Sequence, residues 1–181
     1  MDSAPITVGG VGIFEPAVGV KGETTTLRAS GHPAGGVYDW SIMAGDAADG
    51  TFGPADGTSS GTEVVFSGTE AGTGFVKVTY GTDEDSAPLV VLDVDITDTD
   101  GVSMGVGDTA QVACNATPDP AEVGGALYWY VDGGDAGASF DPTISDSDTT
   151  VMTATGAGAA YLYVEYWHGG QCASDSTPLT V

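Results

Sequence analysis

The sequence contains two copies of one pattern, and this repeat limits the fold to one that half the chain can form by itself. The first copy includes VGVKGETTTLRASGHPAGGVYDWSI and the second includes MGVGDTAQVACNATPDPAEVGGALYWYV. Each stretch has a Gly-acid-Thr turn, an alternating strand, a loop with proline, a Gly-Gly pair and a strand centred on tryptophan. When the two copies are aligned, Trp40 corresponds to Trp129, Phe52 to Phe140 and Tyr80 to Tyr166. The repeat predicts two tandem domains, residues 1–92 and 93–181.

Both copies have the composition of an all-β protein. Short β-branched or aromatic runs alternate with clusters of Gly, Asp, Ser, Thr and Pro, and runs of strong helix formers are missing. We expect seven strands per copy, near residues 11–20, 23–30, 37–43, 50–53, 62–68, 73–81 and 86–92, and near residues 93–106, 108–116, 126–132, 137–140, 148–155, 159–168 and 172–181. Strands at this spacing predict a β-sandwich in each copy, with the tryptophan of the third strand between the sheets.

The residues also carry a family resemblance. The turns KGET and VGDT, the tryptophan strand, and the later strand that ends in VTY in the first copy resemble bacterial immunoglobulin-like domains, including the group 2 type of surface proteins and adhesins. The resemblance covers both copies and implies an all-β protein of two tandem Ig-like β-sandwich domains. It implies a spacer, adhesive or polymer-building role, and it carries over no active-site residues.

Charge is the extreme feature of the composition. The chain has 26 acidic residues, and its only bases are Lys21, Arg28 and Lys77, so the formal net charge is −23. Such a surface repels nucleic acid and anionic membranes, and no apolar run approaches the roughly 20 residues of a membrane span. We therefore expect no nucleic-acid partner and no membrane insertion. The charge suits a halophilic or calcium-rich exterior, with solubility alone as the competing explanation.

The two cysteines, Cys114 and Cys172, both fall in the second copy. In an acidic all-β chain such a pair predicts one disulfide, and hence an oxidising compartment. Two buried thiols are the alternative.

An aromatic patch is expected on the second copy. If Trp129 points inward, strand alternation turns its two neighbours outward, and the stretch YLYVEYW alternates in the same way. The third and sixth strands are neighbours in an Ig-like sheet, so one outer face would show Tyr128, Tyr130, Tyr161, Tyr163 and Trp167. The matching positions of the first copy are Asp39, Ser41, Phe75, Lys77 and Gly81. A contiguous patch predicts an interface or a ligand platform, whereas cross-strand pairs that only stabilise the sheet are the alternative.

Acidic residues cluster at the junction between the copies, where the sequence reads LDVDITDTDG. Asp93, Asp95, Asp98 and Asp100 could supply oxygen ligands to an extracellular calcium ion, the one cofactor that the sequence suggests. A solvated acidic surface is the alternative. The junction lacks a Gly/Ser/Pro linker, which favours a stiff rod.

Catalytic motifs are missing from the sequence. His32 and His168 are the only histidines, both are expected in loops, and no nucleophile or metal-binding spacing surrounds them. We therefore expect no enzyme. The favoured function is an extracellular or cell-surface structural or adhesive protein: an Ig-like rod segment, or a subunit of a filament or surface array that could be a homopolymer. Its partners would be other protein subunits or a cell-surface or glycan ligand, and the alternative function is a carbohydrate-binding module of a secreted protein.

Overall fold

The computed structural model describes residues 9–14, 17–43, 46–53, 58–59 and 61–181. The chain divides into two compact units, Met1–Val91 and Leu92–Val181, called unit 1 and unit 2 below. The described residues are mostly β-strand, with one helix of four residues. The protein is therefore all-β, as the composition predicts, and each unit is described by itself.

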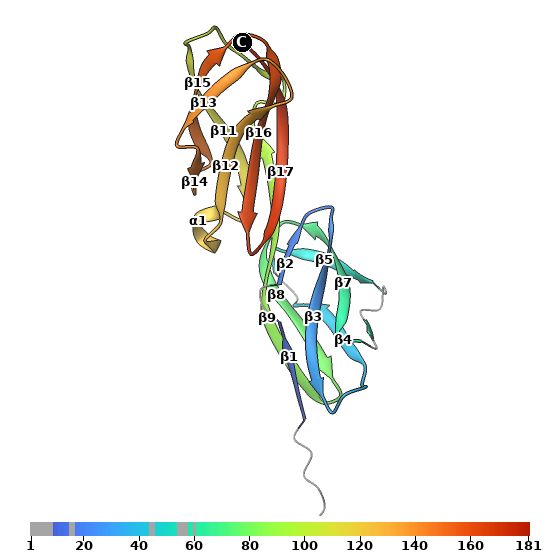
Figure 1. Ribbon diagram of the computed structural model, residues 1–181. Helices are drawn as coiled ribbons and strands as arrows, with labels where there is room; N and C mark the ends of the chain where they lie inside the picture. Colours follow the sequence, from blue (N-terminus) through green and yellow to red (C-terminus); the bar gives the residue numbers. More distant parts are fainter. Residues whose placement is uncertain (1–8, 15–16, 44–45, 54–57, 60) are drawn as a thin grey trace, which may run out of the picture. The chain divides into compact units, whose positions relative to one another are not determined.

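Unit 1 is a sandwich of two sheets. Its strands are β1 (Gly10–Ile13), β2 (Ala17–Val20), β3 (Thr24–His32), β4 (Tyr38–Ile42), β5 (Asp49–Gly53), β6 (Thr58–Ser59), β7 (Glu63–Glu70), β8 (Gly72–Tyr80) and the first part of β9 (Asp83–Ile96). One sheet has the order β1-β3-β7-β5, and the other has β9-β8-β4-β6 with β2 beside β9 (Figure 1). These orders are those of the two sheets of an immunoglobulin-like sandwich.

Unit 2 repeats this arrangement. Its elements are the end of β9, then β10 (Val102–Ser103), β11 (Thr109–Thr117), α1 (Pro120–Val123), β12 (Ala126–Asp132), β13 (Gly137–Asp141), β14 (Ile144–Ser145), β15 (Thr149–Gly156), β16 (Ala159–His168) and β17 (Gln171–Thr180). One sheet has the order β13-β15-β11-β9, and the other has β10-β17-β16-β12-β14, with β10 parallel to β17 (Figure 1).

The sequence expectations differ from these elements at a few places. The strand expected over 93–106 is two pieces, because β9 ends at Ile96 and β10 covers only Val102–Ser103. The two-residue strands β6 and β14 and the helix α1 were not expected. Asp119 caps α1 by accepting a hydrogen bond from the backbone N–H of Ala121 at 2.9 Å, and Gly124 ends it with a φ of 70°.

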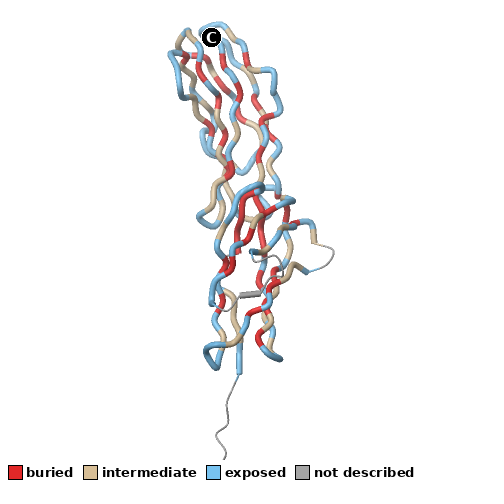
Figure 2. Tube along the Cα trace, turned by 90° about the vertical axis from the view of Figure 1, so that its right-hand side faces the viewer, coloured by how far each residue is buried: buried red, intermediate tan, exposed pale blue. Residues whose placement is uncertain are grey.

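Each core is built from side chains that alternate along the strands, so buried and exposed positions follow one another in Figure 2. Trp40 and Trp129 are 2% and 0% exposed, which confirms their expected place between the sheets. The indole N–H of each has no hydrogen-bond partner among the described residues.

A tyrosine ties one loop to the core in both units. The hydroxyl of Tyr166 donates to the carbonyl of Pro118 at 2.8 Å, and the hydroxyl of Tyr80 donates to the carbonyl of Pro33. In each unit a glycine leaves room for the ring, because a Cβ on Gly125 would collide with Tyr166 and one on Gly36 with Tyr80. The second glycine of each Gly-Gly pair therefore serves packing.

An aspartate from the last strand of each unit bonds to the first strand. Asp85 accepts a hydrogen bond from the backbone N–H of Ile13 at 2.9 Å. Asp175 accepts the same bond from the N–H of Ile96 at 2.7 Å. These carboxylates fix the first strand against the opposite sheet, and charge-assisted bonds of this kind are stronger than neutral ones.

Candidate functional site

The predicted aromatic face lies on β12 and β16 of unit 2. The two strands pair antiparallel over seven residues, and this register places Tyr130 opposite Tyr163 and Tyr128 opposite Glu165. Leu127 and Trp129 of β12 are fully buried, so the tyrosines between and beside them point outward. The structure thus brings the predicted site residues onto one face. We call Tyr128, Tyr130, Tyr161, Tyr163 and Trp167 the aromatic face.

Four of these rings form a continuous ladder. Tyr130 and Tyr163 stack with ring centroids 5.1 Å apart and planes only 7° from parallel. Tyr128 packs beside Tyr130 at 5.6 Å, and Tyr161 beside Tyr163 at 6.4 Å, both tilted. Contacts at these distances stabilise the sheet directly, so part of the ladder serves the fold.

Glu165 joins the ladder to Trp167, and the sequence reasoning did not include it among the site residues. One carboxylate oxygen accepts a hydrogen bond from the hydroxyl of Tyr130 at 2.9 Å. The other accepts one from the indole N–H of Trp167 at 2.8 Å. Glu165 lies two residues from both Tyr163 and Trp167, so strand alternation already places it on the same face and could have identified it.

The surroundings of Tyr130 favour its neutral form. Burial raises the pKa of its hydroxyl to about 12, helped by the hydrogen bond and the negative charge of Glu165 and by nearby Tyr163 and Asp132. The hydroxyl therefore keeps its proton, and the bond to Glu165, across the whole neutral range.

Trp167 stands on an extension that unit 1 lacks. In unit 1 two residues, Gly81 and Thr82, separate the paired residues Tyr80 and Asp83. In unit 2 six residues separate Tyr166 from its partner Ala173, so the hairpin is longer and Trp167 pairs with Cys172. The hairpin turns at Gly169 and Gly170, whose φ angles of 55° and 81° suit a two-residue turn.

The neighbouring strand β17 borders the aromatic face with small exposed side chains. Ser174 pairs with Glu165, Ser176 with Tyr163 and Pro178 with Tyr161, and all three β17 residues are exposed. A pocket of about 200 Å³ lies beside Tyr161 and Pro178. On the other side, Ile144 of β14 pairs with Tyr128.

The same face of unit 1 is mostly polar. Asp39 lies opposite Thr79 and Ser41 opposite Lys77, where unit 2 has Tyr128, Glu165 and the stacked tyrosines. The ammonium of Lys77 pairs with Glu84 at 3.3 Å. Phe75 is the only aromatic residue of unit 1 at these positions, as the sequence comparison indicated.

The predicted disulfide between Cys114 and Cys172 is wrong, because both residues are thiols. Cys114 is buried in the sandwich on β11, where unit 1 has Ala29. On β17, Ala173 and Leu179 point into the core, so Cys172 lies on the outer side of the opposite sheet. Side chains that point away from each other in this way cannot form the bond.

The thiol of Cys114 is unreactive at neutral pH. Burial raises its pKa to about 12, and the negative charge of Asp148 contributes. Asp148 itself has a raised pKa because of burial and the neighbouring Asp119, and its Oδ1 atom is buried without a hydrogen-bond partner among the described residues.

The acidic residues proposed for calcium lie at the start of unit 2. Asp93 and Asp95 are in β9, and Asp98 and Asp100 follow it in an exposed loop. Across the described ranges, no three His, Cys, Asp or Glu side chains lie close enough together to hold a metal ion. Calcium binding by these four residues stays a prediction.

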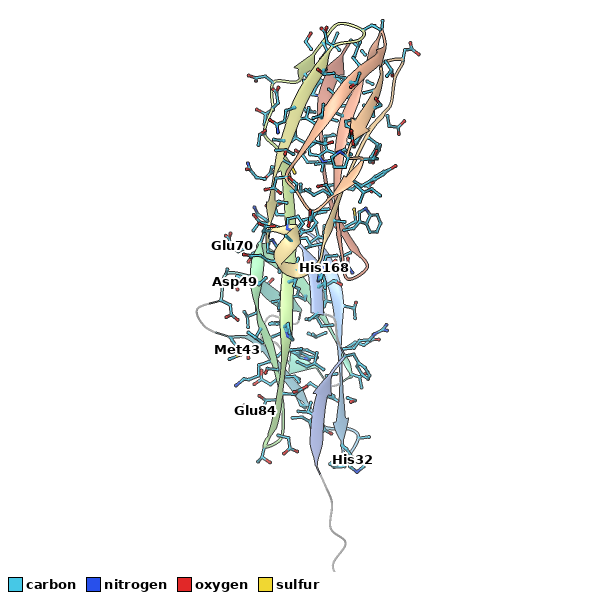
Figure 3. The ribbon with its side chains drawn as sticks, turned by 90° about the vertical axis from the view of Figure 1, so that its left-hand side faces the viewer. His32, Met43, Asp49, Glu70, Glu84 and His168 are labelled. Carbon is cyan, nitrogen blue, oxygen red and sulfur yellow. The ribbon has the colours of Figure 1, made fainter. Side chains whose placement is uncertain are left out.

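The histidines are strand ends and not loop residues. His32 closes β3, and His168 closes β16 (Figure 3). Within the described part of the chain, no helix has the length and apolar character needed to cross a bilayer.

Comparison with known proteins finds likeness in fold. No family model matches the sequence, and no curated protein matches it. The chain is similar to domains 4–9 of the surface-layer protein SbsC, with 13% identity, a TM-score of 0.38, and coverage of 98% of this chain and 32% of that one. It is also similar to three N-terminal domains of the outer capsid protein Hoc of bacteriophage RB49, with 12% identity, a TM-score of 0.49, and coverage of 94% and 68%. A third similar structure holds the two tandem V-type regions of VCBP3, a v-region-containing chitin binding protein, with 14% identity, a TM-score of 0.35, and coverage of 94% and 99%. Function does not follow from a shared fold at such identities.

Proposed function

We propose that this chain is a structural or adhesive segment of an extracellular protein, as part of a filament or surface array, and that the aromatic face is its contact surface. One observation carries the proposal: two units of the same fold differ at this face, and only unit 2 presents the ladder with Trp167. Unit 1 folds with Asp39, Ser41 and Lys77 at the positions of Tyr128, Tyr130 and Tyr163, so the fold does not require these three rings. Tyrosine and tryptophan supply large contact area at low entropic cost.

The charge supports an extracellular location. With a net charge of −23, the protein gains from a saline exterior that screens self-repulsion. The surface-layer and capsid proteins of similar fold do not carry this proposal, since one fold hosts many functions.

The test replaces Tyr128 and Tyr163 with serine in the full chain and follows the labelled protein on intact cells of its host. We expect the double variant to lose surface attachment or assembly while it stays folded by circular dichroism. Its stability should fall by about 1–2 kcal/mol, because cross-strand aromatic pairs contribute roughly 0.2–1 kcal/mol each.

The matched control is Phe75→Ser, which removes the exposed aromatic side chain at the corresponding face of unit 1. It should leave attachment unchanged. If the folded double variant attaches and assembles like the wild type, the ladder only packs the sheet and the proposed contact surface is wrong.

A further inference from the structure

The aromatic face presents rings of two kinds. Tyr130 and Tyr163 stack almost in parallel, so each covers one side of the other. The rings at the margins are more open: Tyr128 is 38% exposed, and Tyr161 and Trp167 are each 47% exposed. A ligand would therefore meet the marginal rings, while the central pair and Glu165 hold them in place.

Exposed hydroxyl groups lie along the face between Tyr161 and Trp167, the two open rings of β16. Ser174 and Ser176 of β17 are exposed and pair with Glu165 and Tyr163 of β16, and Tyr161 lines a pocket of about 200 Å³ together with Pro178. Apolar ring faces next to hydroxyls suit the two sides of a sugar: its C–H groups pack against the negative face of an aromatic ring, and its hydroxyls exchange hydrogen bonds with the serines. Tyr161 and Trp167 are six residues apart on β16, about 20 Å along the strand, which accommodates more than one sugar ring.

The charge of unit 2 selects against an anionic ligand and against a second copy of the chain. Residues 92–181 contain fourteen Asp and Glu residues and no Lys or Arg. An anionic ligand finds no cation there, and a second copy of the chain would bring like charges together. Glu165 offers little to a cationic partner, because both of its oxygens already accept hydrogen bonds from Tyr130 and Trp167, and Asp132, opposite Tyr161, is the other acidic residue on this face.

We infer that the aromatic face binds an uncharged polysaccharide, with sugar rings packed on Trp167 and Tyr161 and sugar hydroxyls bonded to Ser174 and Ser176. This inference rests on the proposed contact surface and names its partner. Glu165 is a positioning residue, since it holds the indole of Trp167 through the Nε1–H bond.

The chain contains its own reporter of occupancy. Of its three tryptophans, Trp40 and Trp129 are buried and only Trp167 is open to solvent. Quenching of tryptophan fluorescence by acrylamide therefore reports mainly on this face. A bound sugar should lower that quenching, and Trp167→Phe should abolish the change.

The experiment measures retention of the full chain on insoluble cellulose, chitin and mannan, with the polyuronate alginate as an anionic comparison. Soluble hexasaccharides of the retained polymer then test protection of Trp167 from acrylamide. We expect retention on at least one neutral polymer and none on alginate. Trp167→Ala and Tyr161→Ser should each weaken binding about tenfold, as expected when a central aromatic contact is removed. Phe75→Ser is the matched control and should bind like the wild type.

Glu165→Ala tests the positioning role, because it removes both oxygens that accept from Tyr130 and Trp167. It should raise acrylamide quenching of the free protein and weaken binding by less than Trp167→Ala does. Unchanged quenching would contradict that role, since a merely structural side chain would leave the indole as exposed as before.

The outcomes separate this inference from the proposed function. If no neutral polymer retains the protein, or if Trp167→Ala binds like the wild type, the polysaccharide inference is wrong. If sedimentation shows self-association that the Tyr128→Ser, Tyr163→Ser variant removes, the occupant is a second copy and the inference is again wrong, while the contact surface stands. Polymer binding by a protein found inside the cell would instead overturn the proposed function alone.

Discussion

Tyr80 in unit 1 and Tyr166 in unit 2 make the same contact, each donating its hydroxyl to the carbonyl of a proline in the loop before the tryptophan strand. Asp85 and Asp175 likewise accept a backbone N–H of the first strand in their own units. The two units differ on their outer face, where Lys77 and Ser41 of unit 1 occupy the positions of the stacked Tyr163 and Tyr130 of unit 2. The inner contacts are therefore those that the sandwich needs, and the outer face is free to carry a function.

The largest expected effect tests whether the inner contacts are equivalent. Trp40→Ala and Trp129→Ala should each destabilise their own unit by about 3–5 kcal/mol, because each leaves a large cavity between the sheets. Hydrogen exchange followed by mass spectrometry, read on β8 and β16, measures the two units separately. Equal loss of protection in both units from either single change would show that they unfold together, and the comparison would fail.

Salt should separate the units by their charge. Unit 1 pairs Arg28 with Glu63 at 2.9 Å and Lys77 with Glu84, whereas unit 2 contains no Lys or Arg. Raising NaCl from low to molar concentration should stabilise unit 2 more than unit 1, by on the order of 1–2 kcal/mol, because screening relieves repulsion that no base offsets. Urea unfolding followed by the same exchange readout measures it.

Adding calcium to this salt experiment distinguishes a specific ion site from general screening. If Asp98 and Asp100 hold calcium, this ion should stabilise unit 2 beyond magnesium at matched ionic strength, and Asp98→Asn with Asp100→Asn should remove only that increment. Equal stabilisation by the two ions would mean screening without a site.

Alkaline titration should reveal Tyr130, which has Ser41 as its counterpart in unit 1. Its pKa of about 12 exceeds that of an ordinary tyrosine, so above pH 10 an unfolded chain loses this proton before the folded chain does. Tyr130 therefore lowers stability as the pH rises from 10 towards 12. Absorbance at 295 nm should show the pKa of one tyrosine shifting from about 12 towards 10 in Glu165→Gln, and an unmoved curve would mean that Glu165 does not contribute to the raised pKa.

The smallest expected effect concerns Asp148 of unit 2, which corresponds to Thr62 of unit 1. The backbone carbonyl of Asp148 accepts a hydrogen bond from the N–H of Cys114, and the carbonyl of Thr62 accepts one from the N–H of Ala29. Burial and Asp119 raise the pKa of Asp148, so its charge opposes folding above that pKa, and the penalty disappears in acid where both states are protonated. Asp148→Asn should stabilise unit 2 at neutral pH by less than about 1 kcal/mol and leave it unchanged near pH 3. A pH-independent gain in melting temperature would point to packing and not to charge.

The sequence sufficed for features that depend on strand alternation. The stretch from Tyr161 to Trp167 alternates as expected, with Leu162, Val164 and Tyr166 buried. The pairing of β12 with β16 followed from the Ig-like order of strands. Alternation would also have excluded the disulfide, because Leu179 points inward and Cys172, seven residues earlier, must then point outward.

Other features depend on distances that the sequence does not encode. Glu165 could be placed on the outer face, yet its two bonds depend on the rotamers of Tyr130 and Trp167. The bonds of Asp85 and Asp175 depend on how closely the first strand approaches the opposite sheet, although the shared motifs DSAPL and DSTPL gave a hint. Helix α1 is too short for a periodic pattern.

The longer β16–β17 hairpin makes the aromatic face transplantable. Its six connecting residues replace two in unit 1. Beyond these connections, β16 pairs with β17 in unit 2 as β8 pairs with β9 in unit 1. A protein engineer could exchange Gly81 and Thr82 for the six-residue segment Trp167–Cys172 and add the ring positions on β4 and β8, leaving the interior of unit 1 untouched. A domain built in this way gains or loses the aromatic face by changes at one hairpin and one sheet face, so a repeated module can change its outer surface while it keeps its core.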